Sequence, residues 1–156
     1  MKVELKKVKV AQHLSEETNA FTAQLWTDGQ YIADLSNDGR GGQNRIYHLF
    51  NGGKGLDTRP QVQSFVEWCK AQPPVEDEQV GSLSMDADFY ISLMIDEHIE
   101  NQQVKRWCKS KTVIRLKGDA KGTFHTYKHP YSPEFAQQIR HNHPDLVEIV
   151  NERFLT

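Results

Sequence analysis

Glycines and basic side chains concentrate in one short window in the first third of the chain. Six of the ten glycines lie between Gly39 and Gly55. Glycine adopts positive φ at little steric cost, so successive backbone N–H groups there can converge on an anion. Basic side chains in the same window would neutralise that anion. The window therefore predicts a candidate binding site, made of Arg40, Gly41, Gly42, Asn44, Arg45, Lys54 and Arg59.

The same window is also consistent with a purely structural joint between a sheet and a helix. Its second cluster, Asn51 to Gly55, precedes a predicted helix N-terminus, where anions are stabilised. However, the phosphate-loop pattern G-x-x-x-x-G-K-[ST] is absent, because no hydroxyl residue follows Lys54. The first cluster, Gly39 to Gly42, leads into a strand-like segment instead of a helix. Both interpretations are open at the level of sequence.

A second group of candidate residues consists of four histidines in the C-terminal third. Histidine binds metals and transfers protons near neutral pH, so this group suggests a histidine-dependent hydrolase or nuclease as a weaker alternative. The competing interpretation is that they are surface residues or helix caps, since a helix C-terminus favours cations. We expect no bound metal and no cofactor. The four are His125, His129, His141 and His143.

Cysteines offer little chemistry in this chain. Cys69 and Cys108 each follow a tryptophan in an amphipathic segment and form no C-x-x-C pair. Two isolated cysteines are too few to make a zinc site. We therefore expect both to be thiols in or near the core.

Length and charge narrow the class of protein. The chain has 156 residues and a formal net charge of −2. This length predicts one domain over residues 1–156, and the charge disfavours bulk electrostatic binding to nucleic acids or membranes. No apolar segment follows Met1-Lys2, and no run of about 18 apolar residues occurs. We expect a cytoplasmic protein without a signal peptide and without membrane association.

The first half of the chain alternates like a β-meander and then becomes helical. Alternation predicts strands over 3–10, with an irregularity at Lys6-Lys7, and over 20–26 and 31–35, joined by an Asp28-Gly29 hairpin turn. Residues 45–50 are a further candidate strand. A helix is predicted from residue 57 or 58, where Thr58 and Gln61 have the capping-box spacing, and it should end before Pro73. Residues 73–84 are predicted to be an exposed loop.

The second half predicts two helices around a hairpin. Ser84 is the expected N-cap of a long helix that reaches about residue 107. Strands over 111–116 and 123–127 follow, and Ser132-Pro133-Glu134 opens a third helix to about Arg140. Residues 146–154 fit a short helix better than a strand. The expected fold is α+β: an antiparallel sheet from an N-terminal β-meander and a C-terminal hairpin, packed with two or three helices.

Some of these turn motifs carry a resemblance. Phe21-x-Ala23-x-Leu25-x-x-Asp28-Gly29, Asn37-Asp38-Gly39-x-Gly41-Gly42-x-Asn44 and Pro130-Tyr131-Ser132-Pro133-Glu134 resemble small uncharacterised proteins of bacteriophages and other mobile elements. The resemblance implies no catalytic residues. It implies a small accessory or counter-defence protein that binds a host target.

Two classes of function therefore follow from the sequence. The first is a non-enzymatic protein that occupies a host protein, with the glycine-rich loops and the acidic run Glu76-Asp77-Glu78 as contact surfaces. The alternative is binding of a nucleotide or nucleic acid through the glycine-rich loops. The first class is preferred because no complete catalytic motif is present.

Overall fold

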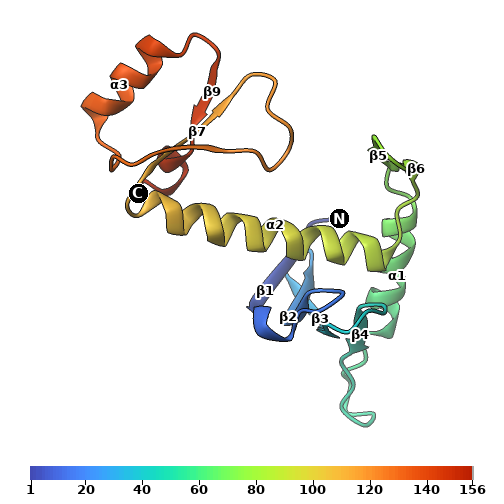
Figure 1. The fold of residues 1–156 in the computed structure, drawn as a ribbon. Coiled ribbons are helices and arrows are strands. Elements are labelled where there is room, and N and C mark those ends of the chain that lie inside the picture. Colours follow the sequence, from blue (N-terminus) through green and yellow to red (C-terminus); the bar gives the residue numbers. More distant parts are fainter. Residues whose placement is uncertain (156) are drawn as a thin grey trace. The chain divides into compact units, whose positions relative to one another are not determined.

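A computed structural model describes residues 1–155 of the chain as an α+β protein with antiparallel sheets. The chain divides into two compact units, Met1–Asp96 and Glu97–Thr156, and helix α2 (Ala87–Cys108) runs through the boundary (Figure 1). The fold class expected from the sequence is confirmed. The single domain expected over residues 1–156 stays a prediction.

The first unit contains a four-stranded antiparallel sheet in the order β1-β2-β3-β4. Its strands are β1 (Val3–Val10), β2 (Ala20–Thr27), β3 (Gln30–Asp38) and β4 (Arg45–His48). A short 3₁₀ turn, η1 (Gln12–Leu14), lies between β1 and β2. The β-meander predicted from the alternation is thereby confirmed.

Two local features of this sheet follow directly from the residues that form them. Asp28 and Gly29 have φ of 48° and 81°, the positive values that a tight hairpin turn with the correct twist needs. In β1 the register against β2 shifts between Lys6 and Lys9, and Lys7 has φ of 49°. Lys7 is thus the site of the irregularity expected at Lys6-Lys7, which bends the edge strand.

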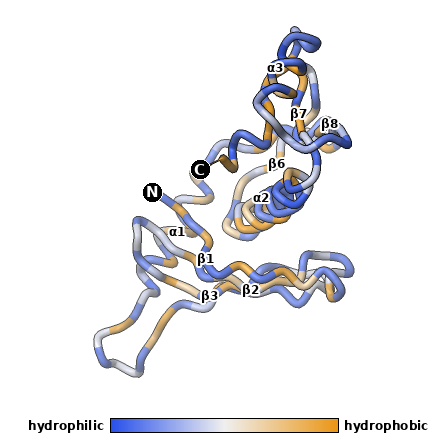
Figure 2. The backbone as a smooth tube through the Cα atoms, turned by 90° about the vertical axis from the view of Figure 1, so that its left-hand side faces the viewer, coloured by the Kyte–Doolittle hydropathy of each residue, from blue (hydrophilic) through white to orange (hydrophobic). Residues whose placement is uncertain are grey.

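One face of the sheet supplies the core of the first unit, and the other is open. Hydrophobic and hydrophilic residues alternate along β2 and β3 (Figure 2). Helix α1 (Arg59–Lys70) and the part of α2 up to Asp96 add buried side chains. The buried residues of these elements include Phe21, Ala23, Leu25, Ala33, Leu35, Phe65, Cys69, Ile91 and Ile95.

The start of α1 differs from the predicted capping box. Thr58 precedes the helix, but its side chain makes no cap hydrogen bond. Its hydroxyl instead donates to Ile32 O at 2.5 Å and accepts from Leu49 N at 2.7 Å. Thr58 is 1 % exposed, so a tertiary contact with two strands has displaced the local cap. Gln61, the expected partner in the box, has a buried Oε1 without a hydrogen bond among the described residues.

Thr58→Val is expected to destabilise the protein by about 2 kcal/mol, because Ile32 O and Leu49 N would each be left without the hydroxyl in the interior. Urea unfolding followed by circular dichroism measures this change. Thr58→Ser is the control, since it keeps the hydroxyl and removes one methyl group. The tertiary role of the hydroxyl would be disproved if Thr58→Val were no less stable than Thr58→Ser.

Two details of the region between α1 and α2 correct the sequence prediction. Residues 73–84 are largely exposed, but they form a small hairpin, β5 (Val75–Asp77) and β6 (Gly81–Leu83), where a loop was expected. The cap of α2 is Asp86 and not Ser84, because Asp86 Oδ1 accepts a hydrogen bond from Phe89 N at 2.7 Å. Asp86 directly precedes the first residue of α2, so its side chain can reach the backbone N–H of the first turn.

The second unit is a three-stranded antiparallel sheet, in the order β8-β7-β9, packed with a helix. It contains β7 (Thr112–Leu116), β8 (His125–Tyr127), α3 (Pro133–Asn142) and β9 (Leu146–Ile149). Ser132 caps α3 as predicted, accepting from Phe135 N at 3.1 Å. The expected short helix over 146–154 is wrong in its first half: β9 pairs with β7, and only η2 (Val150–Phe154) is helical, as a 3₁₀ turn.

Both cysteines are free thiols, as the sequence suggested. Cys69 is completely buried in α1, and this burial raises the pKa of its thiol to about 12. Cys108 is partly buried at the end of α2, and burial raises its thiol pKa as well. Neither thiol has the lowered pKa that makes a reactive cysteine.

Candidate functional site

The first glycine cluster forms a turn between β3 and β4 that is built around the side chain of Asn37. Asn37 Oδ1 accepts from Gly39 N and from Thr18 Oγ1, both at 2.8 Å. Its Nδ2 donates to Asn44 Oδ1 at 3.0 Å and to Gly42 O at 3.3 Å. Because Asn37 is only 8 % exposed, all four of these bonds lie where water does not replace them easily.

The residues of this turn that were predicted to bind a ligand make intramolecular contacts. Asn44 Nδ2 donates to Ser92 Oγ at 2.9 Å and its backbone N donates to Asp88 Oδ1 at 2.7 Å, which ties the turn to α2. Arg45 forms an ion pair with Asp38 at 3.3 Å. The arrangement is that of a tethered structural turn.

Arg40 is the predicted cation of this turn that lacks an ion pair among residues 1–155. It borders a groove of about 530 Å³ with Lys9, Leu14 and Asp38. A carboxylate lies close by, because a Cβ added at Gly41 would come within 2.4 Å of Glu17 Oε2. The Glu17 and Asp38 carboxylates counteract the attraction of Arg40 for an anion.

The second glycine cluster lies in residues 49–58, which we call the projecting loop. It leaves the sheet after β4, extends away from it, and returns to α1 (Figure 1). Thr58 N donates to Leu49 O at 3.0 Å, and Phe50 and Asp57 form an isolated antiparallel bridge. The base of the loop is therefore a two-stranded ribbon.

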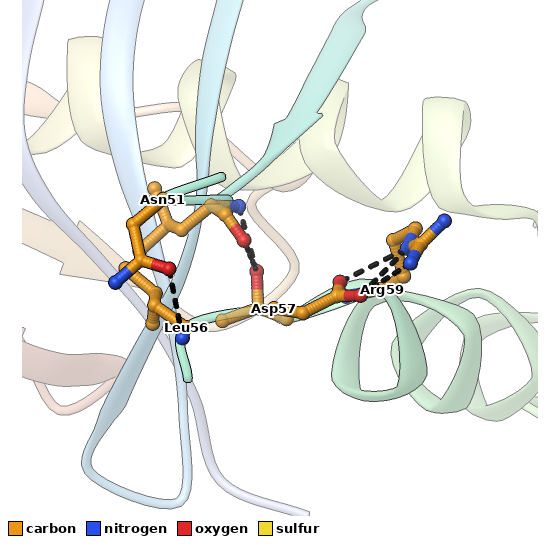
Figure 3. A network of polar contacts seen from close by, with 6 residues as sticks. Asn51, Leu56, Asp57 and Arg59 are labelled. Atoms are coloured by element: carbon orange, nitrogen blue, oxygen red, sulfur yellow. Dashed lines mark hydrogen bonds and ion pairs between the residues drawn. The ribbon is translucent and has the colours of Figure 1, made fainter. Parts of the chain in front are cut away.

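Asn51 organises the tip of the projecting loop. Its Oδ1 accepts from Leu56 N at 3.1 Å (Figure 3). Its backbone N donates to Leu56 O at 3.2 Å, and its Nδ2 donates to Lys54 O at 3.2 Å. The three glycines of the tip have φ of 67° to 90° and open space around their Cα atoms. They are Gly52, Gly53 and Gly55. Glycine is needed there for backbone conformation and not for lack of room.

Asp57 and Arg59 fix the point where the loop enters α1. Arg59 Nε lies 2.9 Å from Asp57 Oδ2, and Arg59 Nη2 lies 2.5 Å from the same oxygen (Figure 3). These hydrogen bonds from the guanidinium lower the pKa of the Asp57 carboxyl to about 2. The guanidinium carbon also lies 5.9 Å from the centre of the Phe50 ring, so Arg59 contacts both sides of the ribbon.

The projecting loop exposes apolar side chains that the sequence analysis did not select. Phe50 is 58 % exposed and Leu56 is 40 % exposed, on opposite sides of the glycine tip. Lys54, at the tip, has no ion pair among residues 1–155. In the sequence, Phe50 and Leu56 are recognisable as two large apolar residues that flank a glycine cluster. Neither is charged, so neither was among the residues expected to bind an anion.

The structure divides the predicted site into two groups. Arg40, Gly41, Gly42, Asn44 and Arg45 lie before or at the start of β4, whereas Lys54 and Arg59 follow its end. The rest of β4 separates the groups, and Arg45 and Arg59 are each paired with a different carboxylate, Asp38 and Asp57. The hypothesis of one anion nest that uses all four cations therefore has no geometric support, and ligand binding by either group stays a prediction.

The four histidines make separate local contacts in the second unit. His125 Nε2 lies 2.9 Å from Asp119 Oδ1, His143 Nε2 lies 2.5 Å from Tyr127 Oη, and His129 Nδ1 lies 2.7 Å from Pro130 O. His141 is exposed near the end of α3. Within residues 1–155, no three His, Cys, Asp or Glu side chains are grouped so that they could hold a metal ion.

Helix length and apolarity were compared with what a membrane span requires. Across the described part of the chain, no helix is both long and apolar enough to cross a bilayer.

Comparison with known proteins adds no family to these observations. No protein-family model, no curated protein and no solved structure matches this chain.

Proposed function

We propose that this chain is a non-enzymatic binding protein that occupies a host protein in the cytoplasm through the projecting loop. The observation that supports this proposal is an exposed, internally hydrogen-bonded loop that presents Phe50 and Leu56 to solvent. The origin in a bacteriophage or another mobile element is part of the same proposal, and it rests on the resemblance of the turn motifs.

The order within the loop favours binding. Asn51 is hydrogen-bonded to Leu56 across the ribbon and to Lys54 at the tip, and Arg59 is hydrogen-bonded to Asp57 where the loop enters α1. Because the loop is already ordered, little conformational entropy would be lost on docking. Large apolar side chains that a rigid element exposes are the typical anchors of protein interfaces.

The partner surface follows from the chemistry of the loop. Phe50 and Leu56 would enter an apolar recess, while Lys54 would meet acidic groups at its rim. The acidic hairpin β5–β6 also remains available as a contact, because Glu76, Asp77 and Glu78 are all exposed. A partner with an apolar recess and an acidic rim fits the projecting loop.

A capture experiment with matched variants tests this proposal. The protein is immobilised and exposed to a lysate of the native host, and the retained proteins are quantified by mass spectrometry. We compare the parent chain with Phe50→Ser and with the control Val147→Ser. Val147 is 59 % exposed in β9 and lies outside both the projecting loop and the β5–β6 hairpin.

The expected result is a protein that the parent chain and Val147→Ser retain equally and that Phe50→Ser retains at least about tenfold less. Thermal unfolding should be alike for all three, because both substituted side chains are exposed. Retention of the same proteins by all three, or of none by the parent chain, would refute the role of the projecting loop.

A further inference from the structure

The open face of the first sheet, which we call the outer face, carries polar and aromatic side chains from all four strands. Register places Trp26 opposite Tyr31, Gln24 opposite Asp34, and Asp34 opposite Tyr47. These residues are partly or fully exposed, whereas Ala23, Leu25, Ala33 and Leu35 on the other face of β2 and β3 are buried. Apart from Ala20, which is buried, the remaining outer positions carry polar or charged side chains: Glu4, Lys6, Lys9, Thr22, Ser36, Asp38 and Arg45.

Three aromatic rings lie on this face, one on each of the strands β2, β3 and β4. The Trp26 and Tyr31 rings are stacked, with centroids 5.6 Å apart and planes at 19°. Their polar atoms are bonded within the face, since Trp26 Nε1 donates to Gln24 Oε1 at 3.3 Å and Tyr31 Oη donates to Asp34 Oδ1 at 2.5 Å. Tyr47, on the next strand, is 52 % exposed. The Trp26 and Tyr31 rings thus offer π-surface while their polar atoms are hydrogen-bonded within the face.

The edge beside these rings is positively charged. Strand β1 contributes Lys6, Lys7 and Lys9, and none of the ion pairs among residues 1–155 includes them. Lys6 Nζ lies 3.7 Å from the centre of the Trp26 ring, so one of these charges already sits on an aromatic face. Two of the acidic groups form ion pairs, Glu4 with Lys2 and Asp38 with Arg45, whereas Asp34 accepts a hydrogen bond from Tyr31 and has no ion pair among residues 1–155.

We propose that the outer face binds single-stranded nucleic acid, with bases stacked on Tyr47, Tyr31 and Trp26 and phosphates held by the lysines of β1. Aromatic rings beside a basic strip are the combination that binds single strands without sequence preference. The flexible Lys6 side chain moves from the Trp26 ring to a phosphate as a base takes its place.

The composition of the face distinguishes this ligand from two others. A protein partner would require aliphatic contact area, and the exposed outer positions provide none, because the one alanine of the outer face, Ala20, is buried. A neutral oligosaccharide would also stack on the rings, but it would make no use of three lysines without ion pairs. The charge of the β1 edge therefore favours a polyanion with exposed bases.

Fluorescence anisotropy with a labelled oligothymidylate of about 15 nucleotides tests this inference, in low salt and in a salt titration. Two variants alter the face: Tyr47→Ala removes an exposed ring, and Lys6→Gln removes one charge. Two matched controls lie outside it: Phe50→Ala removes an exposed ring of the projecting loop, and Lys70→Gln removes an exposed charge of α1. Circular dichroism verifies that every variant is folded.

The parent chain should bind the oligonucleotide with an affinity that falls as salt is added. Tyr47→Ala should weaken binding about tenfold, and Lys6→Gln should weaken it and lower the slope of log affinity against log salt by about one. Both controls should bind like the parent. The proposal would be overturned if the parent chain did not bind the oligonucleotide at about 50 mM salt, or if Tyr47→Ala and Lys6→Gln bound it as tightly as the parent does. A preference of the parent for duplex DNA or for a neutral glucan oligomer would overturn it as well.

This inference is independent of the proposed protein-binding role. Phe50→Ser tests the projecting loop without altering the outer face, and Tyr47→Ala and Lys6→Gln test the outer face without altering the tip of the loop. Failure of one proposal would leave the other intact.

Discussion

Gly39→Ala is expected to lower the free energy of unfolding by about 2–5 kcal/mol. Gly39 has φ of 82°, a region that costs an L-residue about 1–2 kcal/mol. An added Cβ would also lie 2.3 Å from Leu14 O and 2.9 Å from Ala20 Cβ. Because these are a backbone oxygen and a short buried side chain, the backbone must shift, at a further cost of about 1–3 kcal/mol.

The position is further constrained because Gly39 O accepts hydrogen bonds from three backbone groups. Glu16 N, Glu17 N and Thr18 N lie 2.9, 3.0 and 3.4 Å from it. A shift of the Gly39 backbone would disturb the connection between β1 and β2 as well as the turn after β3. The loss should therefore affect the cooperative unfolding of the first unit.

Gly29→Ala is the matched control for Gly39→Ala. Gly29 has nearly the same φ, 81°, but no atom lies within 4 Å of an added Cβ. Urea unfolding should show a loss of about 1–2 kcal/mol for Gly29→Ala and a clearly larger loss for Gly39→Ala. Equal losses would contradict the close packing of Gly39 against Leu14 and Ala20.

Asn151→Ala is expected to destabilise the second unit by about 3 kcal/mol or more. Asn151 is 4 % exposed, and its Oδ1 accepts from Val113 N at 2.8 Å. Its Nδ2 donates to Lys111 O at 2.8 Å and to Cys108 O at 3.3 Å. Alanine would remove the partner of three main-chain groups, each worth about 1–3 kcal/mol when left unsatisfied in the interior.

Asn101→Ala is the control for Asn151→Ala in the same unit. Asn101 is exposed on α2, where alanine is the better helix former, so the control should be neutral or slightly stabilising. Thermal unfolding followed by tryptophan fluorescence measures both variants, because Trp107 packs against Phe124 within this unit. A midpoint for Asn151→Ala close to that of the parent would disprove the role of its amide.

The sequence predicted best those elements whose conformation depends on neighbouring residues. Asp28-Gly29 makes its turn because both residues tolerate positive φ, and Ser132 caps α3 because its hydroxyl reaches the N–H three residues ahead. The irregularity in β1 was visible as two adjacent lysines that interrupt the alternation. These features require no knowledge of distant segments.

Segments whose partners are distant in sequence were predicted less well. Leu146–Ile149 is a strand because β7 pairs with it, Ile114 with Ile149, across 35 positions, and its periodicity alone favoured a helix. Thr58 has the sequence pattern of a helix cap, but Ile32 O lies within reach of its hydroxyl in the folded chain. In both cases a tertiary contact was stronger than the local preference.

The glycine-rich window shows the same difference between local conformation, which the sequence predicts, and long-range contacts, which it does not. The sequence by itself determined that Gly39 to Gly55 would contain backbone with positive φ, because glycine is the residue that adopts it readily. Only the tertiary structure decided that Gly39 is packed against Leu14 whereas Gly52, Gly53 and Gly55 are open to solvent. It also decided that Arg45 faces Asp38 and that Phe50 and Leu56 are exposed, because both depend on which segments the fold brings together.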